Sequence, residues 1–102
     1  MMVLKKPSRD ELVKLVSEFA DEMMNNRAYW ANVSIGNKRL KVTTPRIKKW
    51  LKKRGYTTDL STTWVFTHML KGEMLRRGYT LVDYRKNTNG RKIRIIYIFE
   101  KV

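Results

Sequence analysis

The side chains of this sequence that could do chemistry are mainly basic, and they are densest in the segment DYRKNTNGRKIRI at residues 83–95. Five side chains there are positively charged and only Asp83 is negative. The central Asn-Thr-Asn-Gly is typical of a tight turn, so a β-hairpin is predicted. Such a hairpin is either a solvated tip or a projection that contacts a polyanion. Its basic residues are Arg85, Lys86, Arg91, Lys92 and Arg94.

The charge of the whole chain favours contact with a polyanion. Lys and Arg number 23 against nine Asp and Glu, which gives a net charge of +14. Self-repulsion at that charge destabilises a fold unless a polyanion binds. No acid occurs between Met23 and Thr58, where ten bases occur. Heat-adapted surfaces usually intersperse Glu with Lys, so an acid-free run of this length indicates a nucleic-acid-binding face.

Residues suited to catalysis or metal binding are scarce. The chain has no cysteine, and His68 is its single histidine. The carboxylates lack the paired spacing of acid–base or two-metal catalysis, and the five glycines form no phosphate-loop motif. We therefore expect that the chain is not an enzyme, binds no cofactor and has no metal site. His68 is expected at the surface or against DNA.

Length and hydropathy predict a single domain over residues 1–102. No apolar run approaches the ~20 residues of a membrane span, and Met1–Lys6 is too short for a signal peptide. The absence of cysteine also agrees with a reducing compartment. We expect a cytoplasmic protein that does not contact a membrane. It would be nucleoid-associated in a prokaryote or archaeon, and inside the host cell if viral.

The beginning of the chain predicts a helix followed by extended chain. Ser8 and Glu11 have the spacing of a capping box, and apolar residues at helical spacing follow to about Asn25. Polar and apolar residues then alternate on both sides of Gly36-Asn37, a pair that suits a two-residue turn. A β-hairpin is therefore predicted over Trp30–Val42.

Two further helices and two strands are predicted downstream. Thr44 is expected to cap a short helix whose first residue is Pro45, with Trp50 in the core. Ser61-Thr62 is expected to cap a third helix that ends at Gly78. The core residues of that helix are predicted to be Phe66, Met69, Leu70 and Met74. Strands are predicted over Tyr79–Lys86 and Arg91–Lys101, joined by a turn over Asn87–Gly90.

This order of elements resembles the winged helix-turn-helix family, including small transcription regulators of archaea and their viruses. The residues that carry the resemblance are Thr44–Leu51, Ser61–Phe66, Leu75-Arg76-Arg77-Gly78-Tyr79 and the basic hairpin. Two features depart from the family pattern. The hairpin over Trp30–Val42 is longer than the usual strand, and the third helix begins with few long side chains.

The resemblance implies an α+β fold of three helices, a C-terminal hairpin as the wing, and an additional hairpin between the first two helices. The third helix would enter the major groove of double-stranded DNA, and the wing would contact the backbone or minor groove. Recognition-helix contacts would come from Ser61, Thr62, Thr63, Trp64, Thr67, His68 and Lys71. Wing contacts would come from Arg85, Lys86, Asn87, Asn89, Arg91, Lys92 and Arg94. Phosphate contacts would come from Thr44, Arg46, Lys48, Lys49 and Lys52.

The residues themselves agree with part of this assignment and leave alternatives open. Hydroxyls and free amides in the first turn of the third helix form a natural phosphate-binding end. The threonines there could equally be caps, and the lysines of the second helix a solvated face. RNA or ribonucleoprotein binding, or an adaptor role in transcription or replication machinery, would suit the same charge. A homodimer that reads two half-sites is also possible.

Overall fold

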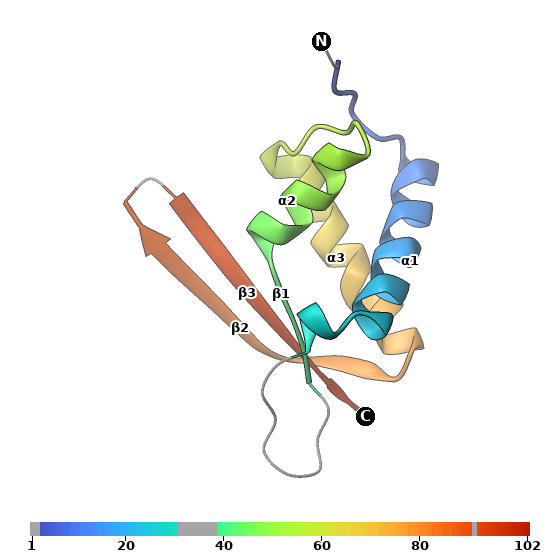
Figure 1. The fold of residues 1–102 in the computed structure, drawn as a ribbon, viewed down its shortest axis with the longest axis vertical. Coiled ribbons are helices and arrows are strands. Elements are labelled where there is room, and N and C mark those ends of the chain that lie inside the picture. Colours follow the sequence, from blue (N-terminus) through green and yellow to red (C-terminus); the bar gives the residue numbers. More distant parts are fainter. Residues whose placement is uncertain (1–2, 31–38, 91) are drawn as a thin grey trace.

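The computed structural model describes residues 3–30, 39–90 and 92–102. Within these ranges the fold is α+β, with three α-helices and a three-stranded antiparallel sheet (Figure 1). The elements are α1 (Arg9–Asn25), the short 3-10 helix η1 (Arg27–Tyr29), β1 (Arg39–Thr43), α2 (Thr44–Lys53), α3 (Leu60–Arg76), β2 (Tyr79–Asn89) and β3 (Lys92–Lys101). Figure 1 places α2 and α3 in the middle, with α1 on one side and the β2–β3 hairpin on the other.

The predicted capping box of α1 is confirmed. The Ser8 hydroxyl accepts a hydrogen bond from the Glu11 amide at 3.2 Å, and the Glu11 carboxylate accepts one from the Ser8 amide at 3.1 Å. The same carboxylate accepts a 2.6 Å hydrogen bond from the Tyr56 hydroxyl and pairs with Lys5 at 3.1 Å. Hydrogen bonds from Tyr56, Ser8 and Lys5 lower the pKa of Glu11 to about 2. Glu11 therefore ties the start of α1 to the segment between α2 and α3.

The core is centred on the ring of Phe19 in α1. Its centroid lies 5.6 Å from that of Tyr29 in η1, 5.1 Å from Trp50 in α2 and 5.5 Å from Phe66 in α3, with each pair of rings edge to face. Phe19 and Phe66 are fully buried, and Trp50 lies in the core as predicted. Edge-to-face pairs of this kind add to the stabilisation from burial alone. One side chain of α1 thus contacts each of the other helical segments.

A second contact between α1 and α3 lies at the end of α3 and is polar. The guanidinium of Arg77 donates to Asp21 at 2.8 Å, to the Glu73 carboxylate at 2.7 Å and to the Ser17 hydroxyl at 3.0 Å. Hydrogen bonding to Arg77 lowers the pKa of Asp21. Gly78 follows with a φ of 85°, a conformation that favours glycine, so α3 ends where the sequence predicts. Arg77 is therefore a structural residue.

The sheet has the strand order β1-β3-β2, with both pairs antiparallel. Leu40 and Val42 of β1 lie opposite Phe99 and Tyr97 of β3, and all four side chains are buried. These alternate residues form the face that packs on the helices. β1 is therefore part of the same sheet as the C-terminal hairpin.

The predicted hairpin over Trp30–Val42 is only partly covered by the described residues. Residues 31–38, including the expected Gly36-Asn37 turn, lie outside them. Trp30 forms an isolated antiparallel bridge with Leu40, and all of β1, Leu40 included, pairs with β3. The described part of this segment thus belongs mainly to the sheet.

The C-terminal hairpin is longer than predicted. β2 continues past Lys86 to Asn89, and Asn87 and Thr88 pair with residues of β3 instead of forming the turn. Gly90 has a φ of 64°, which suits a tight turn. The hairpin extends beyond the helices (Figure 1), and Tyr84 and Ile93 are each 52% exposed there.

Replacing Phe19 by Ala should lower the free energy of unfolding by about 3–5 kcal/mol, because a cavity would replace the ring that contacts three other aromatic side chains. Urea denaturation monitored by circular dichroism measures this loss. Val13→Ala is the matched control on the same helix: Val13 is 45% exposed, and its truncation should stay within about 0.5 kcal/mol of wild type. Equal losses in the two variants would contradict the central role of Phe19.

Stability should also fall in acid through Glu11. Its pKa is lowered from 4.5 to about 2 in the folded chain, so its contribution is present above the unfolded value and is lost as the pH falls through the folded one. Unfolding midpoints measured between these values should decrease less steeply for Glu11→Gln and for Tyr56→Phe than for wild type. Parallel curves for all three proteins would contradict this assignment.

Candidate nucleic-acid interface

Three of the five acids of α1 are paired with bases from elsewhere in the chain. Each pair joins α1 to a different segment: the segment that precedes α1, the end of α2 or the end of α3. The pairs are Lys5–Glu11 at 3.1 Å, Arg54–Glu18 at 3.8 Å and Arg77–Asp21 at 2.8 Å. Arg54 also lies over the ring of Trp50, 3.6 Å from its centroid. The side of the molecule formed by α1 therefore balances much of its own charge.

The outer face of α2 lacks this balance. Lys49, Lys52 and Lys53 are exposed and Lys48 is half-buried, and α2 contains no acid. None of these lysines forms an ion pair with another residue in the described ranges. Lys52 and Lys53 lie in the last turn, where the helix dipole favours positive charge. The four ammonium groups repel one another on one short helix, which an anionic partner would relieve.

Arg46 differs from the other bases of α2. Its guanidinium donates a 2.9 Å hydrogen bond to the Ala28 carbonyl and lies 4.6 Å from the centroid of the Tyr29 ring. It remains exposed, yet these contacts hold it against η1. Of the predicted phosphate contacts on α2, Arg46 therefore has a second, structural role.

Thr44 does not lie where a phosphate contact requires. It is buried and is the first residue of α2, while Thr43 is the N-cap and makes no side-chain capping bond. The Thr44 hydroxyl instead accepts a 3.1 Å hydrogen bond from the amide of Ile95 in β3. Thr44 therefore joins α2 to the hairpin. The predicted N-cap role is wrong, and the predicted phosphate contact would have to be made by a buried side chain.

The start of α3 also differs from the prediction. Asp59, and not Ser61 or Thr62, is the N-cap, and its carboxylate accepts a 2.8 Å hydrogen bond from the Thr62 amide. A phosphate at this end would meet that carboxylate. Thr62, Thr63 and Thr67 are buried, so these three predicted contacts are not on the accessible surface. Sequence alone could have indicated the cap, because Asp is as favourable there as Ser.

Four of the predicted residues of α3 do lie on or near its outer face. Ser61, Trp64 and His68 are exposed and Lys71 is half-buried. The rings of Trp64 and His68 stack, with centroids 4.9 Å apart and planes 17° apart. These residues, and not the threonines, form the surface that α3 offers to a ligand.

The hairpin carries exposed bases beyond the helices. Lys86, Asn87 and Arg94 are exposed, and neither Lys86 nor Arg94 forms an ion pair among the described residues. Arg85 is exposed but pairs with Asp83 at 2.9 Å, a surface contact that a stronger anion can displace. Arg91 and the side chains of Asn89 and Lys92 lie outside the described part of the chain.

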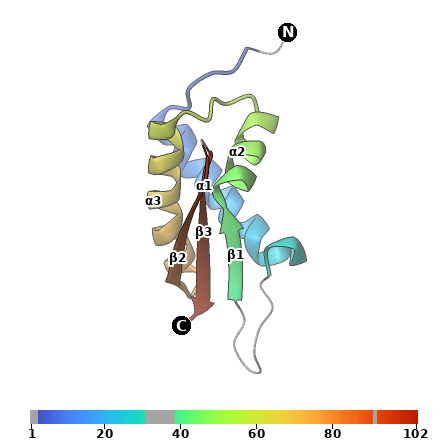
Figure 2. The same ribbon diagram turned by 90° about the vertical axis from the view of Figure 1, so that its left-hand side faces the viewer.

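The outer face of α3 borders the hairpin. Burial raises the pKa of Tyr97 in β3, and a hydrogen bond with Thr67 opposes part of that rise. Residues three and four positions apart are neighbours on a helix, so Trp64 and Lys71 flank Thr67 beside the sheet. Figure 2, viewed from the hairpin side, shows β2 and β3 in front of α2 and α3, with α1 behind them. The hairpin thus lies on the opposite side of α2 and α3 from α1.

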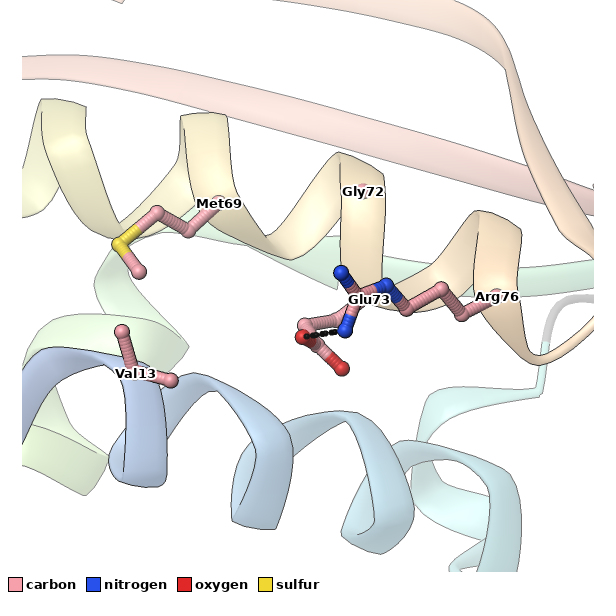
Figure 3. Close-up of a pocket in the computed structure, with 5 residues that line it drawn as sticks. All are labelled: Val13, Met69, Gly72, Glu73 and Arg76. Atoms are coloured by element: carbon pink, nitrogen blue, oxygen red, sulfur yellow. Dashed lines mark hydrogen bonds and ion pairs between the residues drawn. The ribbon is translucent and has the colours of Figure 1, made fainter.

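A shallow hollow of about 270 Å³ lies between α1 and α3 (Figure 3). Val13 and Met69 point into it, Gly72 leaves space, and Glu73 pairs with Arg76 at its side at 3.5 Å. None of these residues is a nucleophile or a histidine. Among the described residues there is also no cluster of three potential metal ligands and no helix long and apolar enough to span a membrane.

Replacing Thr44 by Val keeps the shape of the side chain but leaves the Ile95 amide without its acceptor. The free energy of unfolding should fall by about 1–3 kcal/mol, the usual cost of an unsatisfied buried group. Thr44→Ser keeps the hydroxyl and should lose less than the Val variant in the same urea titration. A larger loss in the Ser variant would show that the methyl group, and not the hydrogen bond, matters.

No protein-family model, no curated protein and no solved structure matches this chain. What the chain binds is therefore inferred from its own surface.

Proposed function

We propose that this chain is a winged helix-turn-helix protein that binds double-stranded DNA and acts as a small transcription regulator. In this assignment α2 and α3 are the helix-turn-helix, residues 54–59 are its turn, and the β2–β3 hairpin is the wing. The succession α1–β1–α2–α3–β2–β3, with β1 and the hairpin in one sheet, supports it. The Leu75–Tyr79 segment, which ends α3 and enters β2, supports it as well.

The observation that carries the proposal is the separation of charge. The lysines of α2 and Lys86 and Arg94 of the hairpin lack acid partners in the described chain, although Arg85 pairs with Asp83. The bases that pair with Glu11, Glu18 and Asp21 lie against α1. Unneutralised bases around an exposed helix are the electrostatic footprint of nucleic-acid binding. The net charge of +14 destabilises the fold by self-repulsion, and an anionic partner that lies against this surface relieves that repulsion most.

Each surface has a separate role in the proposed complex. The outer face of α3 lies in the major groove, which is wide enough to admit a helix. Lys49 and Lys52 contact phosphates on one side of that groove. Lys86 and Arg94 contact the backbone or minor groove beyond it. Thr44, Thr62, Thr63 and Thr67 stabilise the fold and have no part in binding.

Binding to a duplex of mixed sequence should weaken steeply with salt. If Lys49, Lys52, Lys86 and Arg94 each neutralise one phosphate, the logarithm of the association constant should fall against the logarithm of salt with a slope of about −4. Fluorescence anisotropy with a labelled duplex measures this slope. An affinity that is independent of salt would rule out binding through these bases.

A matched pair of double variants separates the proposed surface from net charge. The double variant Lys49→Gln with Arg94→Gln should make the slope less negative by about two units. It should weaken binding to all DNA sequences alike. Arg9→Gln with Lys14→Gln removes the same charge from exposed positions of α1 and should leave the slope close to wild type. Equal effects of the two double variants would place binding elsewhere.

Competition identifies the class of nucleic acid. Unlabelled duplex DNA should displace the labelled duplex better than single-stranded DNA or a structured RNA at the same salt concentration. RNA as the strongest competitor would replace the DNA proposal with the RNA-binding alternative. No salt-dependent binding to any of the three would favour the adaptor role.

A further inference from the structure

The outer face of α3 is unusually apolar for a helix beside unpaired bases. Leu60, Trp64 and Leu75 are 85%, 64% and 57% exposed. They lie on one side of the helix, because residues four positions apart are neighbours and eleven positions are close to three full turns. Large exposed apolar side chains that gather on one face commonly mark a contact site. On α2, by contrast, the exposed face is formed by lysines.

The side chains that usually identify guanine and adenine are missing from most of this helix. Between residues 60 and 75 there is no Arg, Asn or Gln, and Lys71 is the single residue of a type that pairs with guanine. Arg and Lys form paired hydrogen bonds with guanine in the major groove, and Asn and Gln form them with adenine. The remaining feature of the major groove that an apolar side chain recognises is the C5 methyl group of thymine. The composition of α3 therefore favours contact with a methyl group.

Trp64 is the residue best placed for such a contact. His68, one turn later, stacks on its indole at a centroid distance of 4.9 Å. The Thr67 hydroxyl donates a 2.9 Å hydrogen bond to the Trp64 carbonyl, and Thr67 itself is buried against the sheet. The indole is thus held on a fixed stretch of backbone and supported by His68 on one face of its ring. A side chain that is ordered before binding loses little conformational entropy when it docks.

We propose that Trp64, supported by His68, contacts the C5 methyl group of thymine in the major groove and gives the protein a preference for methylated pyrimidines. The proposal rests on the proposed function, since it places α3 in that groove. It adds to it a recognised chemical group and a residue that recognises it. Ser61 and Lys71, on the same side of the helix, supply hydrogen bonds to the flanking backbone or base edges.

The test uses two duplexes of about 20 base pairs, roughly two helical turns, that differ only in thymine against uracil. Burial of one methyl group should make wild type bind the thymine duplex about fourfold more tightly. Trp64→Ala should bring the ratio of the two affinities close to one, and His68→Ala should reduce it. Val13→Ala, an exposed apolar truncation on α1, should keep the wild-type ratio.

A second pair of duplexes, with cytosine or 5-methylcytosine opposite guanine, tests the same contact by adding a methyl group instead of removing one. Wild type should bind the methylated duplex more tightly, and Trp64→Ala should bind both alike. Circular dichroism of Trp64→Ala verifies that the variant is folded, as expected for a side chain that lies mainly in solvent. Trp64→Phe, which keeps an aromatic ring, should retain part of the preference.

The outcomes separate this inference from the proposed function. Equal wild-type affinity for the thymine and uracil duplexes, with the salt dependence intact, would overturn the methyl contact and leave DNA binding in place. A wild-type preference that survives in Trp64→Ala would overturn the role of Trp64. Failure to bind any duplex in a salt-dependent way would overturn both proposals.

Discussion

Contact of the Phe19 ring with Tyr29, Trp50 and Phe66 is the interaction on which the rest of the molecule depends. These residues belong to η1, α2 and α3, so a single side chain of α1 sets how the helical segments lie against one another. Once the buried faces of α2 and α3 are fixed, their opposite faces must turn toward solvent. The lysines of α2 and the apolar side chains Leu60, Trp64 and Leu75 of α3 are exposed as a result of the same packing.

The charged side chains are also distributed unevenly between α1 and the surface formed by α2 and the hairpin. Acids of α1 pair with Lys5, Arg54 and Arg77, which stabilises the helical side of the molecule. The lysines of α2 and Lys86 and Arg94 of the hairpin have no acid partner among the described residues. Surface pairs of this kind contribute little individually. Their larger effect is on the distribution of electrostatic potential, since most of the positive charge that is neutralised by acids lies away from the hairpin. A polyanion that approaches would therefore be steered to the side where Lys86 and Arg94 lie.

Local signals in the sequence predicted the elements well, and side-chain roles less well. The capping box of Ser8 is decided within one turn, and Gly78 ends α3 by its own conformational freedom. Burial of Thr44 and Thr67 depends on where the sheet lies, which periodicity does not reveal. The predicted inward face of α3 is confirmed, since Phe66, Leu70 and Met74 are buried and Met69 packs against the core. The pairing of β1 with β3 is a long-range contact that local pattern does not encode.

The most direct measurement of the central claim is an NMR titration of the isotope-labelled protein with duplex DNA. If α3 and the hairpin form the binding surface, amide shifts should concentrate at residues 60–72 and 84–95 and at the outer face of α2. The amides of α1 that face away from the hairpin should remain unchanged. Shifts confined to α1, or none at DNA concentrations that saturate binding, would contradict the account.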